Sequence, residues 1–156
     1  MPYKHGRPVI DLSIWFRTAS AWTFYLVFPI AMAYNFLQHF TRYKHRWRLS
    51  GIYRAITVSN HTTFLDPVKL TGLMLPRLVY QTLLGATVEF PVLGTFIRLL
   101  GGVPIPGGKT GYHKILEICN RAFKYRRYLH FYPEGECYLY SNRIGKFHTG
   151  AFRIAA

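Results

Sequence analysis

The strongest constraint in this sequence is a stretch of 21 residues without a formal charge, from Thr18 to Gln38. As a helix it would extend roughly 32 Å, close to the ~30 Å hydrocarbon core of a bilayer. The stretch therefore predicts a membrane-anchoring helix, with a buried core helix as the alternative. A cleaved signal peptide fits less well, because the apolar stretch is long and no small-x-small cleavage site follows it.

The flanks of this stretch do not fix how it would enter a membrane. Basic residues lie on both sides, at Lys4, Arg7 and Arg17 and again between 42 and 48, so the positive-inside rule chooses no orientation. Pro29 lies in the middle and would kink a helix there. A kinked or re-entrant anchor held in one leaflet fits both facts, so spanning is less well supported than insertion. The second basic cluster would then lie against anionic headgroups.

The charge balance points to a polyanionic neighbour. Of the 156 residues, Lys and Arg number 20 and Asp and Glu only 6, which gives a formal net charge of +14. An anionic membrane surface or nucleic acid would attract such a chain. The two cysteines, Cys119 and Cys137, are not spaced as a CxxC pair, so we expect neither a disulfide framework nor a metal site.

After residue 48 the sequence changes to short alternating elements. Their β-α-β-α order predicts an α/β fold with a mainly parallel central sheet flanked by helices, preceded by the apolar anchoring helix. We therefore divide the chain into a membrane anchor with basic flanks, 1–48, and a folded domain, 49–156. The strands are expected at 53–59, 78–84, 103–106 and 128–132, and the helices at 66–75, 91–100, 112–127 and 149–156.

A histidine and an aspartate stand five positions apart where the first strand should turn into the first helix. Asp66 would be the N-cap of that helix, with Pro67 at its first position. In this geometry the carboxylate can accept a hydrogen bond from one ring nitrogen of His61, which leaves the other nitrogen free to take a proton. The pair is consistent with general-base chemistry, although a plain N-cap beside a polar loop histidine would give the same sequence.

A second group of residues follows the last predicted strand. Phe131-Tyr132-Pro133-Glu134-Gly135 stands at its carboxyl end, and Gly145–Ala151 comes soon after. Sites in parallel α/β sheets form at the carboxyl ends of strands. His61 and Glu134 both occupy such ends, and the turn at 101–106 supplies a third strand-adjacent segment, so we expect one site there.

These blocks, in this order, resemble the glycerolipid acyltransferase family, whose best-known members are 1-acylglycerol-3-phosphate acyltransferases. Asn60-His61-x4-Asp66, with Thr63, matches the family's first block. Residues 131–135 match its Phe-Pro-Glu-Gly block, with Tyr132 at the Phe position, and 145–151 resemble the continuation. The resemblance covers roughly 50–156 and stops before the family's fourth block, so we expect a C-terminally truncated member.

The resemblance implies a membrane-bound enzyme of phospholipid biosynthesis. It would move a fatty acyl group from a thioester of CoA or acyl carrier protein to a lysolipid hydroxyl, with no cofactor beyond that donor. His61 would be the general base and Asp66 would hold its tautomer. The catalytic domain would lie on the cytoplasmic face. The resemblance assigns substrate binding to Asn60, Thr63, Glu134 and Gly135.

Two departures from the family pattern concern the acceptor. Gly107 and Cys137 stand where the family carries arginines that would pair with the acceptor phosphate. The nearest replacements are Lys109, Arg143 and Lys146, but lysine does not reproduce the bidentate phosphate contact of arginine. We therefore expect acceptor recognition to differ from that of a lysophosphatidate enzyme.

Two other classes of protein remain as alternatives. The basic and aromatic runs 44–48 and 124–128 would suit a membrane-anchored module that binds anionic lipid or nucleic acid without catalysis. A solvated surface facing headgroups explains them more simply, so nucleic acid is not an expected partner. A hydrolase using Ser59 or Ser141 lacks the G-x-S-x-G turn of such enzymes.

Overall fold

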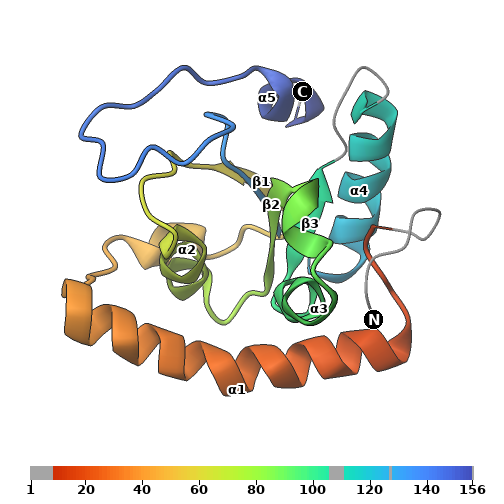
Figure 1. The fold of residues 1–156 in the computed structure, drawn as a ribbon, viewed down its shortest axis with the longest axis horizontal. Helices are drawn as coiled ribbons and strands as arrows, with labels where there is room; N and C mark the ends of the chain where they lie inside the picture. Colours follow the sequence, from red (N-terminus) through yellow and green to blue (C-terminus); the bar gives the residue numbers. More distant parts are fainter. Residues whose placement is uncertain (1–8, 106–110, 127, 156) are drawn as a thin grey trace.

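The computed structural model describes residues 9–105, 111–126 and 128–155, and in this part of the chain the centre of the fold is a four-stranded sheet (Figure 1). The strand order is β1-β4-β2-β3 and every pairing is parallel. The predicted α/β fold with a parallel sheet is therefore confirmed. The strands are β1 (Ala55–Val58), β2 (Val79–Leu84), β3 (Gly102–Ile105) and β4 (Tyr128–Phe131).

The helices lie close to their predicted ranges because proline and glycine mark their ends. Pro67 lies in the first turn of α2 and Pro91 begins α3, where a missing backbone N–H costs no hydrogen bond. The helices are α1 (Ile14–His39), α2 (Asp66–Met74), α3 (Pro91–Leu99), α4 (Gly111–Tyr125) and α5 (Gly150–Ala155), with short 3₁₀ turns η1 (Arg46–Leu49) and η2 (Gly85–Val88).

The sheet is covered on both faces, as expected for a parallel sheet. On one face Leu129 and Phe131 of β4 belong to a buried cluster with Ile118 and Ala122 of α4. Ala151 of α5 joins the same cluster. On the other face, Val79 and Tyr128 pack with Met74 of α2. The alternation of these side chains along β4 follows the two-residue period of a strand.

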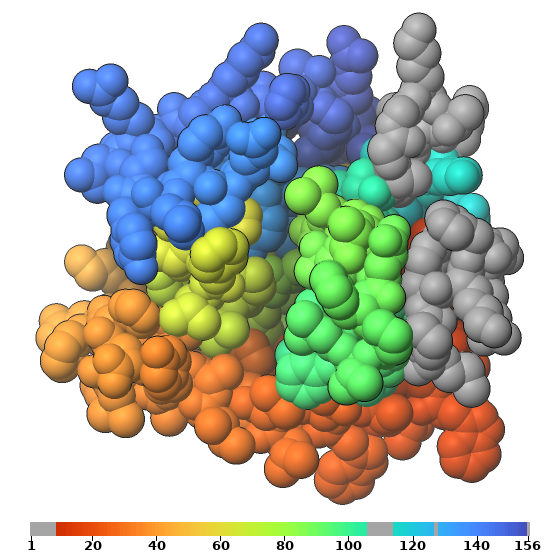
Figure 2. Space-filling view, viewed as in Figure 1, coloured from red at the N-terminus to blue at the C-terminus, as the bar shows by residue number. Residues whose placement is uncertain are grey.

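Helix α1 runs along the outside of the layer formed by α2 and α3 and contacts both (Figure 1). It is continuous through Pro29. In the space-filling view α1 forms a band along one side of the molecule (Figure 2, red to orange). Among the described residues α1 alone is long and apolar enough to cross a membrane, a test that the core helices of soluble proteins also pass.

The two sides of α1 have different surroundings. Ser20, Phe24, Phe28 and Asn35, which follow one another at spacings of four, four and seven positions, are buried against the domain. The opposite side is apolar as well, but it is exposed, with Trp15, Trp22, Leu26, Ile30 and Leu37 each more than half accessible to solvent. The domain therefore covers only one side of this apolar helix.

A buried guanidinium joins α1 to the sheet. Arg126 is 4% exposed and donates to the carbonyl oxygens of Val79 (3.0 Å), Leu99 (3.1 Å) and Leu100 (3.1 Å), as well as to the hydroxyl of Ser20. Burial lowers the pKa of Arg126. These acceptors pair the two terminal nitrogens, whereas Nε has no partner among the described residues. Because a buried charge is costly without such bonds, the acceptors hold α1, the end of α3 and the start of β2 together.

Gly101 provides a test of this junction. It has φ +104°, and a Cβ there would overlap the Arg126 guanidinium and lie 2.7 Å from the Val79 oxygen. Gly51 also has a positive φ, +81°, but a Cβ there would meet nothing within 4 Å. Gly51→Ala should lower the free energy of unfolding by about 1–2 kcal/mol from backbone strain alone. Gly101→Ala should cost about 1–3 kcal/mol more from overpacking.

Urea unfolding of the two variants in detergent would measure the difference. Equal losses of stability in Gly101→Ala and Gly51→Ala would contradict the close packing of Arg126 against the turn between α3 and β3.

Candidate active site

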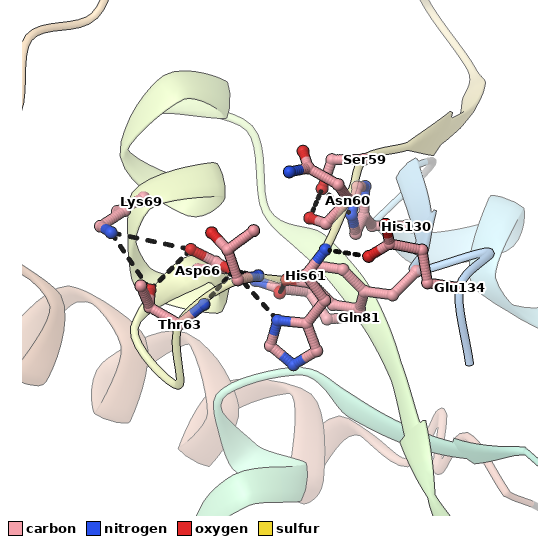
Figure 3. A network of polar contacts seen from close by, with 11 residues as sticks. Ser59, Asn60, His61, Thr63, Asp66, Lys69, Gln81, His130 and Glu134 are labelled. Atoms are coloured by element: carbon pink, nitrogen blue, oxygen red, sulfur yellow. Dashed lines mark hydrogen bonds and ion pairs between the residues drawn. The ribbon is translucent and has the colours of Figure 1, made fainter. Parts of the chain in front are cut away.

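The loop from β1 to α2 places His61 beside Asp66 (Figure 3). His61 Nδ1 lies 3.0 Å from Asp66 Oδ2, and the two side chains are 19% and 16% exposed. Among the described residues Nδ1 has a hydrogen-bond partner in Asp66, whereas none is found for Nε2. An ionised carboxylate can only accept, so Nδ1 carries the ring proton of a neutral His61 and Nε2 presents a lone pair.

The Asp66 carboxylate is held by the loop that precedes it. Oδ2 accepts from the backbone N–H groups of Thr62 (2.6 Å) and Thr63 (2.8 Å), and Oδ1 accepts from the Thr63 hydroxyl (2.7 Å). Lys69 Nζ lies 3.7 Å from Oδ1. Burial raises the pKa of Asp66, but the hydrogen bonds from Thr63, His61 and Thr62 outweigh it and keep that pKa below its usual value.

The expectation that Asp66 is the N-cap of α2 was wrong. Leu65 is the cap residue and Asp66 is the first residue of the helix. The carboxylate points back to the N–H groups of the loop, so it does not accept from the later N–H groups that a capping side chain would reach. It therefore orders the loop that carries His61.

Glu134 is brought to the same loop from the end of β4. It is 4% exposed, and its Oε2 accepts from the backbone N–H of His61 (2.9 Å). Its Oε1 accepts from the backbone N–H of Gly145 (2.6 Å). Gly135, with φ +74°, makes the turn that follows. Each carboxylate oxygen of Glu134 thus accepts from a backbone N–H, and the two N–H groups belong to different loops.

The chain after Glu134 returns along the loop that carries His61. The backbone N–H of Tyr138 donates to the His61 carbonyl and that of Tyr140 to the Thr62 carbonyl, each at 2.9 Å. The histidine loop therefore has the segment after β4 on one side and α2 on the other.

The other predicted site residues differ in whether they contact the His61–Asp66 pair. Thr63 bonds directly to Asp66, whereas Asn60 is exposed beside His61. Arg143 and Lys146 are exposed on the loop that Glu134 anchors through Gly145. Lys109 lies outside the described residues.

Residues that the sequence analysis did not single out complete the surroundings. Lys69 stands one helical turn after Asp66 and also donates to the Thr63 hydroxyl (3.1 Å). Gln81, a polar residue in the otherwise apolar first half of β2, donates to the Pro67 carbonyl and to the Thr71 hydroxyl, both at 2.7 Å. A lysine at helical spacing from the aspartate, and a glutamine within a buried strand, were the signals available in the sequence.

His130 of β4 lies buried below the loop. Its Nδ1 is 2.9 Å from the Thr57 hydroxyl and its Nε2 is 3.1 Å from the Ser59 hydroxyl. Ser59 donates its own proton to the Asn60 carbonyl, so His130 Nε2 must donate to Ser59. A ring nitrogen that donates to Ser59 cannot take its proton, and this arrangement gives no support to a hydrolase with a Ser59 nucleophile.

Metal ions have no apparent site among the described residues, which contain no group of three His, Cys, Asp or Glu side chains suited to one.

The fold and the site define a class: a parallel α/β domain with a histidine–aspartate pair at the carboxyl end of its first strand. A family model described as Acyltransferase matches residues 42–156, which is most of the chain and includes every site residue described above. The chain therefore belongs to the acyltransferase family. No curated protein and no solved structure matched it. Family membership favours an enzyme of acyl transfer over a binding module without catalysis.

His130 should make stability depend on pH. The pKa of His130 is lowered to about 3, mainly by burial and also by the nearby charge of His61, whose effect exceeds the opposing effect of Asp66. The unfolded chain takes up this proton near the ordinary value of 6.5, so the folded state loses stability as the pH falls from there. The expected slope approaches about 1.4 kcal/mol per pH unit.

The comparison is between wild type and His130→Gln, each unfolded in urea at several values between about pH 6.5 and pH 4. The wild type should lose stability more steeply than His130→Gln, while His148→Gln, at an exposed histidine, should follow the wild type. Parallel curves for wild type and His130→Gln would show that His130 is not held neutral by the fold.

Proposed function

We propose that this acyltransferase moves a fatty acyl group from a thioester to the hydroxyl of a lysolipid, with His61 as the general base. The observation that carries the proposal is the bond between His61 Nδ1 and Asp66 Oδ2, at 3.0 Å. It fixes the ring so that Nε2 is the nitrogen available to an acceptor hydroxyl. Three donors from Thr62 and Thr63 keep the carboxylate in the ionised form that this role needs.

In the proposed reaction the acceptor hydroxyl is the nucleophile. Its oxygen attacks the thioester carbonyl carbon while its proton passes to His61 Nε2. The tetrahedral intermediate then collapses, the C–S bond breaks, and the imidazolium gives the proton to the departing thiolate. The products are an ester and a free thiol. No acyl-enzyme is required, so positioning and general-base catalysis supply the rate. The donor would be acyl-CoA or acyl carrier protein, and no cofactor takes part.

The acceptor would bind beside the loop that follows β4. We assign its anionic headgroup to Arg143 and Lys146, with Lys109 as a third candidate, because arginines are missing at Gly107 and Cys137. Asn60 adjoins His61 in the chain, Thr63 bonds to Asp66, and Gly135 forms the turn after Glu134. Glu134 would act by holding two loops, since both of its oxygens accept from the backbone. This arrangement differs from a standard lysophosphatidate site, so the headgroup preference should differ too.

We further propose that α1 lies in one leaflet of a membrane, with the domain on the cytoplasmic face. One side of α1 packs against α2 and α3 along its length, which would not allow it to leave the domain and span a bilayer. Its exposed apolar side is free to enter lipid, and the net charge of +14 favours anionic headgroups. The lysolipid acceptor would then be drawn from the same membrane.

Substitutions at the pair test the chemistry. His61→Ala should lower turnover by about 10²–10⁴-fold, because that is the usual contribution of a general base. Asp66→Asn should be nearly as harmful, since an amide does not stabilise the imidazolium. The double variant should be little worse than His61→Ala alone, because the two residues act as a unit. Initial rates would be measured with labelled acyl-CoA and a panel of lysolipids.

The control for this series is His39→Ala, which changes an exposed histidine at the end of α1 and should keep full turnover. Circular dichroism and thermal unfolding would show that each variant is folded. Normal turnover in folded His61→Ala would exclude the proposed mechanism.

The exposed side of α1 tests the location. Leu26 and Ile30 are 72% and 69% exposed, and replacing both with glutamate should weaken binding to anionic vesicles more than tenfold, because each buried leucine or isoleucine contributes about 1.5–3 kcal/mol. Ile144→Glu is the matched control, because Ile144 is equally exposed, at 72%, but lies on the loop after β4. Its binding to the vesicles should stay close to that of the wild type. Vesicle sedimentation gives the affinity. Unchanged binding by Leu26→Glu/Ile30→Glu would argue against α1 as the anchor.

A further inference from the structure

An aromatic ring lies against the face of the proposed base. Tyr132 is the residue after β4, and its ring is stacked on the His61 imidazole with centroids 4.2 Å apart and planes 25° from parallel. Asp66 contacts the same imidazole at its edge, through Nδ1. The ring thus has one electrostatic partner in its plane and another above its face.

The stacked ring is fixed from behind. The Tyr132 hydroxyl donates to Gln81 Oε1 (3.0 Å), and Gln81 in turn donates to the Pro67 carbonyl and the Thr71 hydroxyl of α2. Gln81 is 8% exposed, so this chain of bonds is shielded from water. These bonds hold Tyr132 to α2, the helix that begins with Asp66. Both side chains that contact the imidazole, Asp66 and Tyr132, are therefore positioned by α2.

The tyrosine stays neutral in this position. Burial raises the pKa of Tyr132, and the Asp66 charge raises it further. A neutral phenol keeps its proton for Gln81 and presents an electron-rich face, and such a face attracts a cation.

We propose that Tyr132 is a positioning residue for His61 whose ring stabilises the imidazolium that forms during acyl transfer. The inference rests on the proposed role of His61 as general base. When Nε2 takes the acceptor proton, the new positive charge lies over the Tyr132 face while Asp66 holds Nδ1. The interaction is stronger in this charged state than with neutral imidazole, so it lowers the barrier more than it strengthens substrate binding.

Other charged and titratable groups near His61 act differently. From α2, Asp66 bonds to the ring, and the Lys69 charge lies beyond Asp66, 3.7 Å from its other oxygen. From β4, His130 is held neutral by burial. From the loop after β4, Glu134 accepts from the His61 backbone N–H, Tyr138 donates its backbone N–H to the His61 carbonyl, and Cys137 lies near Asp66 and Glu134. Of these groups, His130 also contacts the Tyr132 ring, with centroids 4.6 Å apart.

Removing the aromatic face should have a specific kinetic signature. Tyr132→Leu should lower kcat by about threefold to thirtyfold, the range of a shielded cation–π contact, with little change in KM. The acid limb of the pH–rate profile should move to lower pH, because protonated His61 loses a favourable contact. Phe131→Leu is the matched control: it makes the same change one residue earlier, in the core cluster on the other face of the sheet. It should alter stability without moving the acid limb.

A fluorine series removes the effect of packing. Tyr132→Phe keeps the ring and loses the bond to Gln81, and it should stay within about threefold of wild type. Placing 4-fluoro-, 3,5-difluoro- and 3,4,5-trifluorophenylalanine at position 132 then withdraws charge from the ring face at nearly constant shape. We expect log kcat to fall progressively with the number of fluorines.

Three results are distinguishable. A progressive fall, together with an inactive His61→Ala, supports the proposal. A flat fluorine series with an inactive His61→Ala overturns the role of Tyr132 and leaves the general base in place. An active His61→Ala overturns the proposed mechanism and the role of Tyr132 with it.

Discussion

The site depends on one buried carboxylate, that of Glu134. A charge removed from water must be compensated, and here the two compensating donors are backbone N–H groups of His61 and Gly145. These residues belong to loops that are far apart in the chain. The bond to His61 fixes the backbone of the histidine, while Asp66 fixes its side chain, so neither loop can move without leaving an unpaired charge. The rigidity of the site therefore comes from the requirement to satisfy Glu134.

Sequence patterns were informative where the determining contacts are local. The order of elements predicted the parallel sheet because proline, glycine and β-branched residues mark strand and helix ends without reference to the rest of the chain. The meeting of His61 with Asp66 is also local, since five residues cross a single turn. The prediction that Asp66 is the N-cap was wrong in the same segment. Its carboxylate accepts from two N–H groups of the preceding loop and not from those of the helix.

Contacts that depend on strand order could not be read from the sequence. Strand β4 lies between β1 and β2, and this places His130 beside Thr57 and brings Tyr132 within reach of Gln81. No periodicity in the sequence specifies that order. Glu134 is predicted from its motif to help bind the acceptor, and only the fold reveals that each of its oxygens also accepts from a backbone N–H.

The Arg126 junction has a consequence for how this protein is handled in the laboratory. The guanidinium uses the Ser20 hydroxyl as one of its acceptors and lies 5.7 Å from the centre of the Phe24 ring, and both residues come from α1. Cutting the chain after α1 would expose both the Arg126 guanidinium and the apolar surface that α1 covers. The remaining domain would therefore be prone to aggregate. A water-soluble form is better sought by replacing the exposed apolar residues of α1 with polar ones. The residues of α1 that are buried against the domain should be kept.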